Sequence, residues 1–248
     1  MPQVITPAIV IRRSDYSDYD RMVTLFAPEM GRIDAIARGC RRPKSPLVNA
    51  VEPFTSGEFQ LYERRDRFTL EQCQISESYY ALRSDYDRLC HGVYWLKLLD
   101  TAILPDTPAP ELFITTLRAL AHLNWGELPS EMVTMAFEMH FMALNGFAPR
   151  MDACCKCGRP INGDCRFDAS LGGSVCLDCW SKAPLISNGA RRIMMKLPRT
   201  QFDKFQLLDG HPDWPEAARH FRSYINLKMH MDKFAPPLYE ETRDDPKG

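Results

Sequence analysis

The stretch RMVTLFAPEMGRIDAIARG, residues 21–39, decides the fold class of the N-terminal part of the chain. It holds two short segments rich in β-branched and apolar residues around the turn-forming PEMG, a pattern typical of two strands joined by a tight turn. Similar segments occur at residues 4–13, 56–64 and 68–75. Because no helical pattern comes between them, the sequence predicts a small barrel or curled sheet over residues 1–80 and not a βαβ unit.

The pattern changes near residue 80, where apolar residues begin to recur at helical spacing. One of these segments, residues 131–145, is apolar on nearly every face and rich in methionine, with Ser130 as its predicted N-cap. It is predicted to be the buried centre of a small helical bundle; the alternative is an adaptable methionine-lined groove for a partner. The predicted helical segments are Leu82–Leu104, 111–123, 131–145, 187–197, a weaker run at 200–208, and Pro215 to about Lys233.

Composition sets the context of the chain. Its 248 residues suffice for one to three domains, and a hydrophobic content of 45% with 25% charged residues is ordinary for a globular protein. The N-terminal MPQVITPAIVIRR lacks the pattern of a signal peptide, and no apolar run approaches the roughly 18 residues of a membrane span. Nine cysteines without an export signal favour a cytoplasmic, reduced protein, and so favour metal binding over disulfides.

Two cysteine pairs carry the strongest single signal in the sequence. Cys154 and Cys157 form one CxxC pair, Cys176 and Cys179 form another, and 18 residues separate the pairs. Each pair can turn two thiolates toward one tetrahedral ion, and Gly158 supplies the permissive backbone that such a turn needs. The spacing predicts one structural zinc ion per chain, held in a module at residues 151–180.

The module contains two further cysteines, and its four-thiolate site limits what a bound zinc ion could do. Cys155 and Cys165 are interpreted as spare thiols, with backup ligation as the alternative. Four thiolates close the coordination sphere of zinc and leave no position for a reacting water. The six histidines form no metal-binding pattern. The zinc site is therefore predicted to be structural and not catalytic.

Positive charge gathers in the stretch GRIDAIARGCRRPKSP, residues 31–46. Such a cluster on a loop suits contact with nucleic-acid phosphates; the alternative is an ordinary solvated loop. Exposed aromatic residues could add base stacking, and the candidates are Tyr16, Tyr19, Phe54, Phe59 and Tyr62. The predicted DNA-binding residues are Arg32, Arg38, Arg41, Arg42 and Lys44, extended by Arg12 and Arg13 at the end of the first strand.

The order of these features resembles a known family. The stretch YSDYDRMVTLFAPEMGRIDAIARGCRRPKSPL, with EPFTSGEFQLY after it, is similar to the N-terminal domain of the RecO recombination-mediator family, and CCKCG…FDASLGGSVCLDC to its zinc-bearing members. The resemblance implies an α+β protein: an N-terminal OB-fold β-barrel at residues 1–80, followed by a helical domain at 81–248 into which the four-cysteine zinc module is inserted. It also assigns DNA contacts to Arg38, Arg41, Arg42 and Lys44, and zinc ligands to Cys154, Cys157, Cys176 and Cys179.

The resemblance further implies a function in DNA repair and homologous recombination, and a chain that is not an enzyme and has no small-molecule substrate. Such proteins bind single- and double-stranded DNA, anneal complementary strands and, with RecR, help load RecA onto DNA coated by single-strand-binding protein. They act in the bacterial cytoplasm at the nucleoid and contact the acidic C-terminal tail of the coating protein; the candidate basic partners for that tail are Lys182, Arg191, Arg192 and Lys196. The alternatives are a zinc-scaffolded protein-binding adaptor and a metal-dependent nucleic-acid enzyme.

Overall fold

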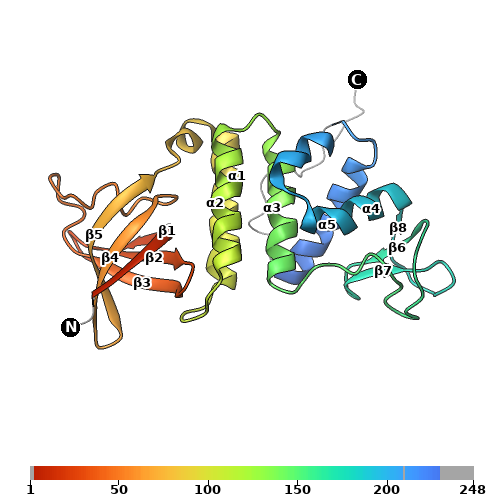
Figure 1. Cartoon of the computed structure of the whole chain (residues 1–248), viewed down its shortest axis with the longest axis horizontal. Coiled ribbons are helices and arrows are strands. Elements are labelled where there is room, and N and C mark those ends of the chain that lie inside the picture. The colour runs from red at the N-terminus through yellow and green to blue at the C-terminus, as the bar shows by residue number, and fades with distance from the viewer. Residues whose placement is uncertain (1–2, 209, 230–248) are drawn as a thin grey trace, which may run out of the picture. The chain divides into compact units, whose positions relative to one another are not determined.

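Five strands close into a barrel in the computed structural model, which describes residues 3–208 and 210–229 (Figure 1). Around the barrel the order is β1-β2-β3-β5-β4, and β1 pairs with both β2 and β4. All neighbours are antiparallel except β3 and β5, whose parallel pairing closes the barrel. The five-stranded, OB-like barrel predicted for the N-terminus is confirmed. The strands are β1 (Gln3–Asp15), β2 (Arg21–Ala27), β3 (Gly31–Ala37), β4 (Ser56–Arg64) and β5 (Arg67–Glu77).

Alternation along the strands separates the barrel interior from its outer face. In β3, Ile33 and Ala35 are buried in the core cluster, whereas Asp34 between them is exposed. The core is filled by aliphatic side chains and Phe59, which is fully buried. Gly31 begins β3 with φ +66°, and a Cβ there would lie 2.3 Å from the Leu104 carbonyl oxygen, so only glycine fits this close approach.

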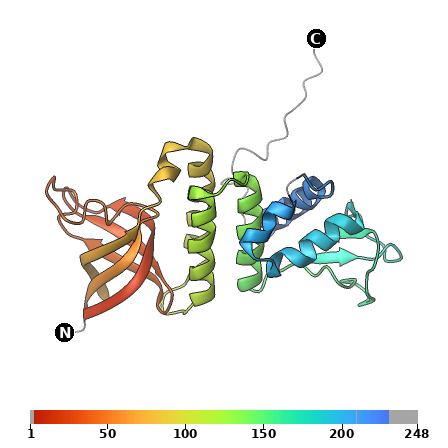
Figure 2. The same ribbon diagram turned by 45° about the horizontal axis from the view of Figure 1, so that its top comes forward.

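Two helices pack beside the barrel and belong to the same compact unit (Figures 1 and 2). They are α1 (Tyr86–Ala102) and α2 (Pro110–Trp125), preceded by the 3-10 helix η1 (Tyr80–Ser84). The α-helix begins later than the predicted Leu82 because Asp85 caps it: its carboxylate accepts a hydrogen bond from the Arg88 N–H at 3.2 Å. The Arg88 guanidinium in turn donates to the carbonyls of Leu123 and Asn124 at the end of α2.

Packing divides the chain into two units, Met1–Trp125 and Gly126–Gly248. The predicted domain boundary at residue 80 marks the change from strands to helices, and it stays a prediction. Across the described residues, no helix is both long and apolar enough to cross a membrane.

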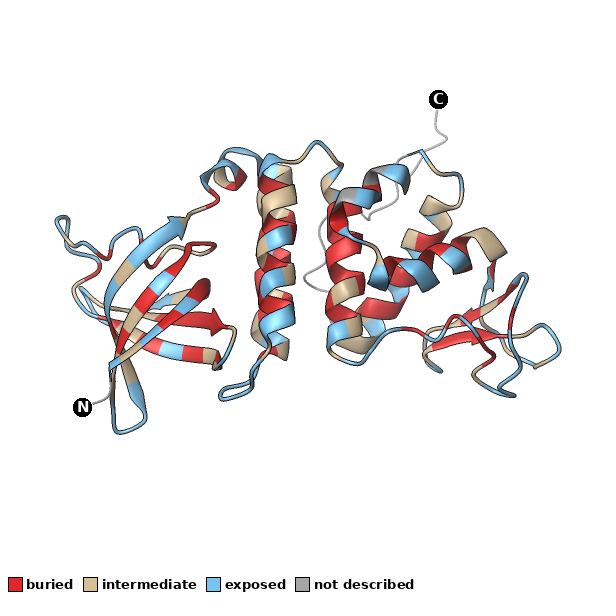
Figure 3. Cartoon of the chain, viewed as in Figure 1, coloured by how far each residue is buried: buried red, intermediate tan, exposed pale blue. Residues whose placement is uncertain are grey.

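The second unit is built on α3 (Ser130–Leu144), which is buried over most of its surface (Figure 3). Its four methionines are at most 3% exposed, so the interpretation of this helix as a core element is confirmed. The N-cap prediction for Ser130 is wrong: Pro129 occupies the cap position and Ser130 is already helical. The unit also contains β6 (Cys165–Asp168), β7 (Gly173–Val175), β8 (Leu185–Ile186), α4 (Asn188–Lys196), η2 (Leu197–Arg199), η3 (Phe202–Leu208) and α5 (Trp214–Met229).

One ion pair ties α3 to α5 inside this unit. The Arg222 guanidinium lies 3.1 Å from the Glu138 carboxylate, and both side chains are more than 90% buried.

The predicted helix that contains Arg222 extended to Lys233, and its residues 230–233 lie outside the described part of the chain.

Candidate nucleic-acid interface and metal centre

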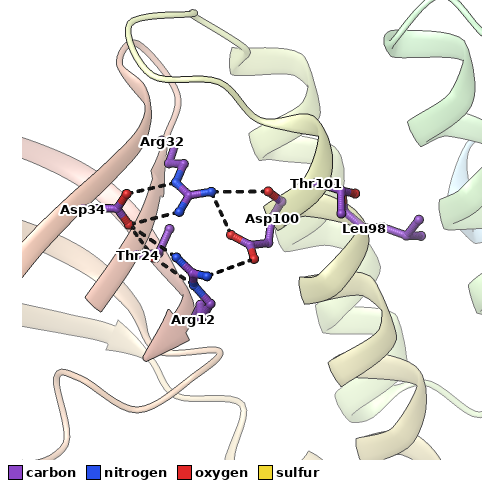
Figure 4. A network of polar contacts seen from close by, with 7 residues as sticks. All are labelled: Arg12, Thr24, Arg32, Asp34, Leu98, Asp100 and Thr101. Carbon is purple, nitrogen blue, oxygen red and sulfur yellow. Dashed lines mark hydrogen bonds and ion pairs between the residues drawn. The ribbon is translucent and has the colours of Figure 1, made fainter. Parts of the chain in front are cut away.

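Arg12 and Arg32, both predicted DNA contacts, lie in an ion-pair network on the outer face of the barrel (Figure 4). Strand register explains it, because Arg12 pairs with Thr24 on β2 and Thr24 pairs with Asp34 on β3. Asp100 of α1 adds a second carboxylate, 3.1 Å from Arg32 and 3.7 Å from Arg12. Both guanidiniums therefore already have carboxylate partners within the chain.

Arg13, the other residue by which the predicted patch was extended, is also paired. Its guanidinium contacts the Glu52 carboxylate, which also lies 3.4 Å from Arg21. Arg21 additionally pairs with Asp15 at 3.2 Å. Position at the end of a strand thus does not make an arginine available to a ligand.

The loop at residues 38–46 presents its charges to solvent, as the sequence predicts. Arg38, Arg42 and Lys44 are exposed and form no ion pair with any described residue. The Arg42 guanidinium lies 5.1 Å from the ring centroid of the exposed Tyr19, which is a cation–π contact. Arg41 is partly engaged, at 3.3 Å from both the Asp15 carboxylate and the Ser17 carbonyl oxygen.

Asp20 organises the base of this loop. Its carboxylate accepts a 2.8 Å hydrogen bond from the Gly39 N–H, where the backbone turns through φ +63°. That bond, together with the Ser17 side chain and the nearby charges of Arg38 and Arg42, lowers the pKa of Asp20. The carboxylate is therefore ionised at neutral pH and fixes the loop where it leaves β3.

A groove of about 860 Å³ lies next to this loop, and sequence reasoning missed most of its charge. The parallel pairing of Ile36 with Thr69 brings the end of β3 beside the β4–β5 hairpin. The groove then gathers four exposed arginines, none of which forms an ion pair among the described residues. Two acidic residues, Asp20 and Glu71, also line it, so its net charge is positive. The arginines are Arg38, directly after β3, and Arg64, Arg65 and Arg67 from the hairpin.

Apart from Tyr19, which contacts Arg42, the candidate aromatic residues lie either in this groove or in the interior. Phe54 and Phe59 are 2% and 0% exposed, so they belong to the core and cannot stack on a base. Tyr16 and Tyr62 line the groove, and Tyr16 is 56% exposed. The groove therefore combines cations with an accessible aromatic ring, the combination that single-strand-binding barrels use.

The four predicted metal ligands come together in the second unit. The Sγ atoms of Cys154, Cys157, Cys176 and Cys179 all lie within 4.8 Å of one another. Backbone N–H groups of Lys156 and Cys176 each point at the Cys154 sulfur, at 3.4 Å. Four thiolates at this separation fit a tetrahedral ion of zinc's size and softness.

The four thiols differ in how readily they ionise. Burial opposes ionisation of Cys154, yet the N–H groups of Cys176, Cys157 and Lys156 lower its pKa to about 6. Hydrogen bonding from the Arg159 side chain lowers the pKa of Cys157. The Cys179 thiol, by contrast, bonds to the sulfurs of Cys176 and Cys157, and its pKa rises to about 12. The thiolates repel one another, and a bound dication would allow all four to ionise.

The remaining cysteines of the module lie outside this cluster. Cys165 is fully buried on β6, and burial raises its pKa. Burial likewise raises the pKa of Cys155, whose backbone N–H donates to the Ser174 carbonyl at 2.8 Å. Neither thiol belongs to the group of close sulfur atoms.

A second pocket, of about 660 Å³, lies against α4, η2 and η3. Two of the four cations named for an acidic tail, Arg192 and Lys196, line it together with Lys204 and the apolar side chains of Ile193, Leu197, Leu207 and Leu208. Lys182 lines a different pocket. Arg191 is only 4% exposed and donates to the Met151 carbonyl and to Asn188, so it holds the fold and does not face a ligand.

Comparisons with known proteins match nearly the whole chain to one protein family. The family model "Recombination protein O N terminal" matches residues 1–79, and "Recombination protein O C terminal" matches residues 83–233. The DNA repair protein RecO of Anaeromyxobacter sp. strain K is 32% identical over 238 residues, 94% of this chain and 93% of its own. That of Symbiobacterium thermophilum is 36% identical over 197 residues, 76% of this chain and 77% of its own. The chain therefore belongs to the RecO family, whose members are recombination mediators in DNA repair and not enzymes.

Proposed function

We propose that this chain binds single- and double-stranded DNA, anneals complementary strands and, with RecR, helps load RecA onto DNA coated by single-strand-binding protein. The proposed DNA surface is the barrel groove together with the loop at residues 38–46. We place the protein in the bacterial cytoplasm, associated with the nucleoid. One zinc ion, held by the four clustered cysteines, is proposed to support the fold of the second unit.

This proposal rests on one observation: the four arginines that line the groove form no ion pair with any described carboxylate. Groove arginines that lack an internal ion pair give up no protein contact when they bind a phosphate. Phosphates supply most of the sequence-independent affinity for nucleic acid, which is what a mediator acting on arbitrary sequences needs. The accessible ring of Tyr16 adds sequence-tolerant base stacking.

The double variant Arg64→Glu, Arg65→Glu tests this surface. We expect at least a tenfold loss of oligo(dT) affinity at low salt and slower annealing of complementary strands. Arg118→Glu is the matched control, because Arg118 is an exposed arginine of α2 that forms no ion pair among the described residues. A double variant that keeps the parent's affinity and annealing rate overturns the proposal. It would then favour a protein-binding adaptor.

The loop is tested separately by Arg41→Glu with Arg42→Glu. The expected loss of DNA affinity is smaller than for the hairpin variant, because Arg41 already contacts Asp15 and the Ser17 carbonyl. The weakening should be similar across DNA sequences, since phosphate contacts carry no base information. A loss confined to particular sequences would contradict this role for the loop.

We also propose that the pocket against α4 receives the C-terminal tail of single-strand-binding protein. Three cations, one carboxylate (Asp213) and several leucine and isoleucine side chains line this pocket, and the excess of positive charge with apolar surface matches an acidic peptide with a hydrophobic end. Fluorescence polarisation with that tail peptide should show salt-sensitive binding, weakened about tenfold by Lys196→Glu with Lys204→Glu. Lys182→Glu is the control, because Lys182 lines another pocket. Equal weakening by the control variant would remove this pocket from the proposal.

A further inference from the structure

An exposed tryptophan projects from the proposed zinc module, directly after the last clustered cysteine. Trp180 is 74% exposed, the same fraction as Leu207, and these are exceeded only by Tyr86 among the large apolar side chains that the structure describes. Exposure of so large an apolar surface costs free energy in water unless a ligand covers it. The neighbouring Leu177 is also 58% exposed.

Two lysines flank this ring. The Lys156 and Lys182 ammonium groups lie 5.7 and 6.0 Å from the centre of the Trp180 ring. Lys156 also donates to the Trp180 carbonyl oxygen, which fixes the backbone that carries the ring. Neither lysine forms an ion pair within the described part of the chain. The exposed Trp180 ring therefore has two positive charges near it, one from a lysine that precedes it in the chain and one from a lysine that follows it.

Lys182 also extends this surface into a pocket of about 690 Å³ beside α5. The exposed Arg219 lines the same pocket and has no ion-pair partner among the residues described. The two carboxylates of the pocket are occupied internally. Asp168 accepts from Ser170 and Ser181, and Glu216 accepts from the Ser187 N–H and hydroxyl. These hydrogen bonds occupy oxygens of both carboxylates, which keep their negative charge, whereas Lys182 and Arg219 have no ion-pair partner among the described residues and are available to a phosphate.

We propose that Lys156, Trp180, Lys182 and Arg219 form a second binding site for single-stranded nucleic acid, on the second unit of the chain. A base stacks on the Trp180 indole, and the adjoining phosphates of the strand contact the lysines and Arg219. Base stacking on an aromatic side chain accepts any base, and phosphate contact is equally independent of sequence. This goes beyond the function proposed above, which assigns DNA binding to the barrel alone. A chain with two such sites can hold two single strands at once.

The test uses the full-length, zinc-loaded protein in which Arg64→Glu and Arg65→Glu have weakened the barrel groove. Binding of fluorescein-labelled oligo(dT) is measured at low salt. Adding Trp180→Ala should weaken the remaining binding at least about fivefold, whereas Trp180→Phe should stay within about twofold because it keeps an aromatic face. Leu177→Ala is the matched control for loss of exposed apolar surface and should change nothing.

Charge is tested by Lys182→Glu with Arg219→Glu in the same background. We expect weaker binding and a flatter dependence of affinity on salt, since two phosphate contacts are removed. Zinc content is measured for every variant; if Trp180→Ala loses zinc, this charge pair decides the question, because neither residue adjoins a clustered cysteine.

Three results with DNA as the ligand overturn the second site. They are unchanged binding in Trp180→Ala with zinc retained, unchanged binding in the charge pair, and a background protein without measurable oligo(dT) binding. An acidic peptide that binds through Trp180 while DNA does not also overturns it. Failure of the barrel proposal gives a different result. In that case the double variant Arg64→Glu, Arg65→Glu binds oligo(dT) with the affinity of the parent protein.

Discussion

The outer face of the barrel and its groove both carry arginines, yet the two regions are built differently. On the outer face, Arg12 and Arg32 form ion pairs with the carboxylates of Asp34 and Asp100 (Figure 4). In the groove, the hairpin arginines lie at the last paired residues, Arg64 and Arg67, and in the turn between them, and they form no ion pair among the described residues. Cations with internal partners hold elements together, and cations without them are available to a ligand.

The proposed metal centre should show the largest effect of internal pairing, because one ion would join four thiolates from two segments of the second unit. Cys176→Ser should release zinc and destabilise the second unit by several kcal/mol, or make the protein insoluble, since structural zinc binding is worth about 10 kcal/mol or more. Elemental analysis and thermal unfolding measure this. Cys165→Ser is the control and should keep one zinc per chain. Metal loss in Cys155→Ser, with Cys154→Ser retaining it, would contradict the ligand assignment.

The most deeply buried paired arginine should show the next largest effect. Arg222→Met keeps the length of the side chain but removes the charge that faces Glu138 inside the second unit. Removing one partner of a buried pair typically costs about 3–5 kcal/mol, because the remaining charge is left in the interior. Chemical denaturation should show this loss, while oligo(dT) affinity stays unchanged below the unfolding transition. A cost under about 1 kcal/mol would mean that the pair contributes little to the fold.

Arg32 allows a paired arginine and an unpaired one to be compared within the barrel. Arg32→Gln removes the ion pairs to Asp34 and Asp100, so the free energy of unfolding should fall by about 1–2 kcal/mol, with the partial exposure of the network limiting the effect. DNA affinity should change less than it does for Arg65→Gln. The reverse order of DNA effects would restore Arg32 as a DNA contact and remove the distinction between the two regions.

The smallest effect on stability belongs to the hairpin. Neutralising Arg64, Arg65 and Arg67 together to glutamine should change the unfolding temperature very little, because exposed charges contribute little to folding. The slope of log affinity against log salt for single strands should nevertheless become less steep by about 2, or about 0.7 for each lost phosphate contact. An unchanged slope with an intact fold would show that the groove does not bind DNA.

The sequence predicted those features that depend on local pattern. Alternation around Ile33 and Ala35 indicated strands, and the spacing of the two CxxC pairs indicated which four of nine cysteines come together. The exposed charges of Arg38, Arg42 and Lys44 followed from their place in a proline-containing loop. In each case, neighbours within a few residues determine the outcome.

Features that depend on strand register could not be predicted in this way. Nothing local tells that Asp34 lies across the sheet from Arg12, or that α1 brings Asp100 to the same place. The hairpin arginines were missed because ERRDR looks like an ordinary polar turn, and it adjoins Arg38 only through the parallel pairing of β3 with β5. An arginine-rich turn between two strands of a predicted barrel is the signal that could have pointed to them.

The parallel pairing of β3 with β5 also determines how the protein folds. Residues 35–37 find their partners at residues 68–70, so the barrel cannot close until the β4–β5 hairpin has formed and docked. During synthesis β1, β2 and β3 therefore form an open three-stranded sheet with unpaired edges until the ribosome has added residue 77, the end of β5. Contacts this distant in sequence form slowly compared with helix pairs. We expect closure of the barrel to be the slow step in folding of the first unit, and the open sheet to be its most aggregation-prone intermediate.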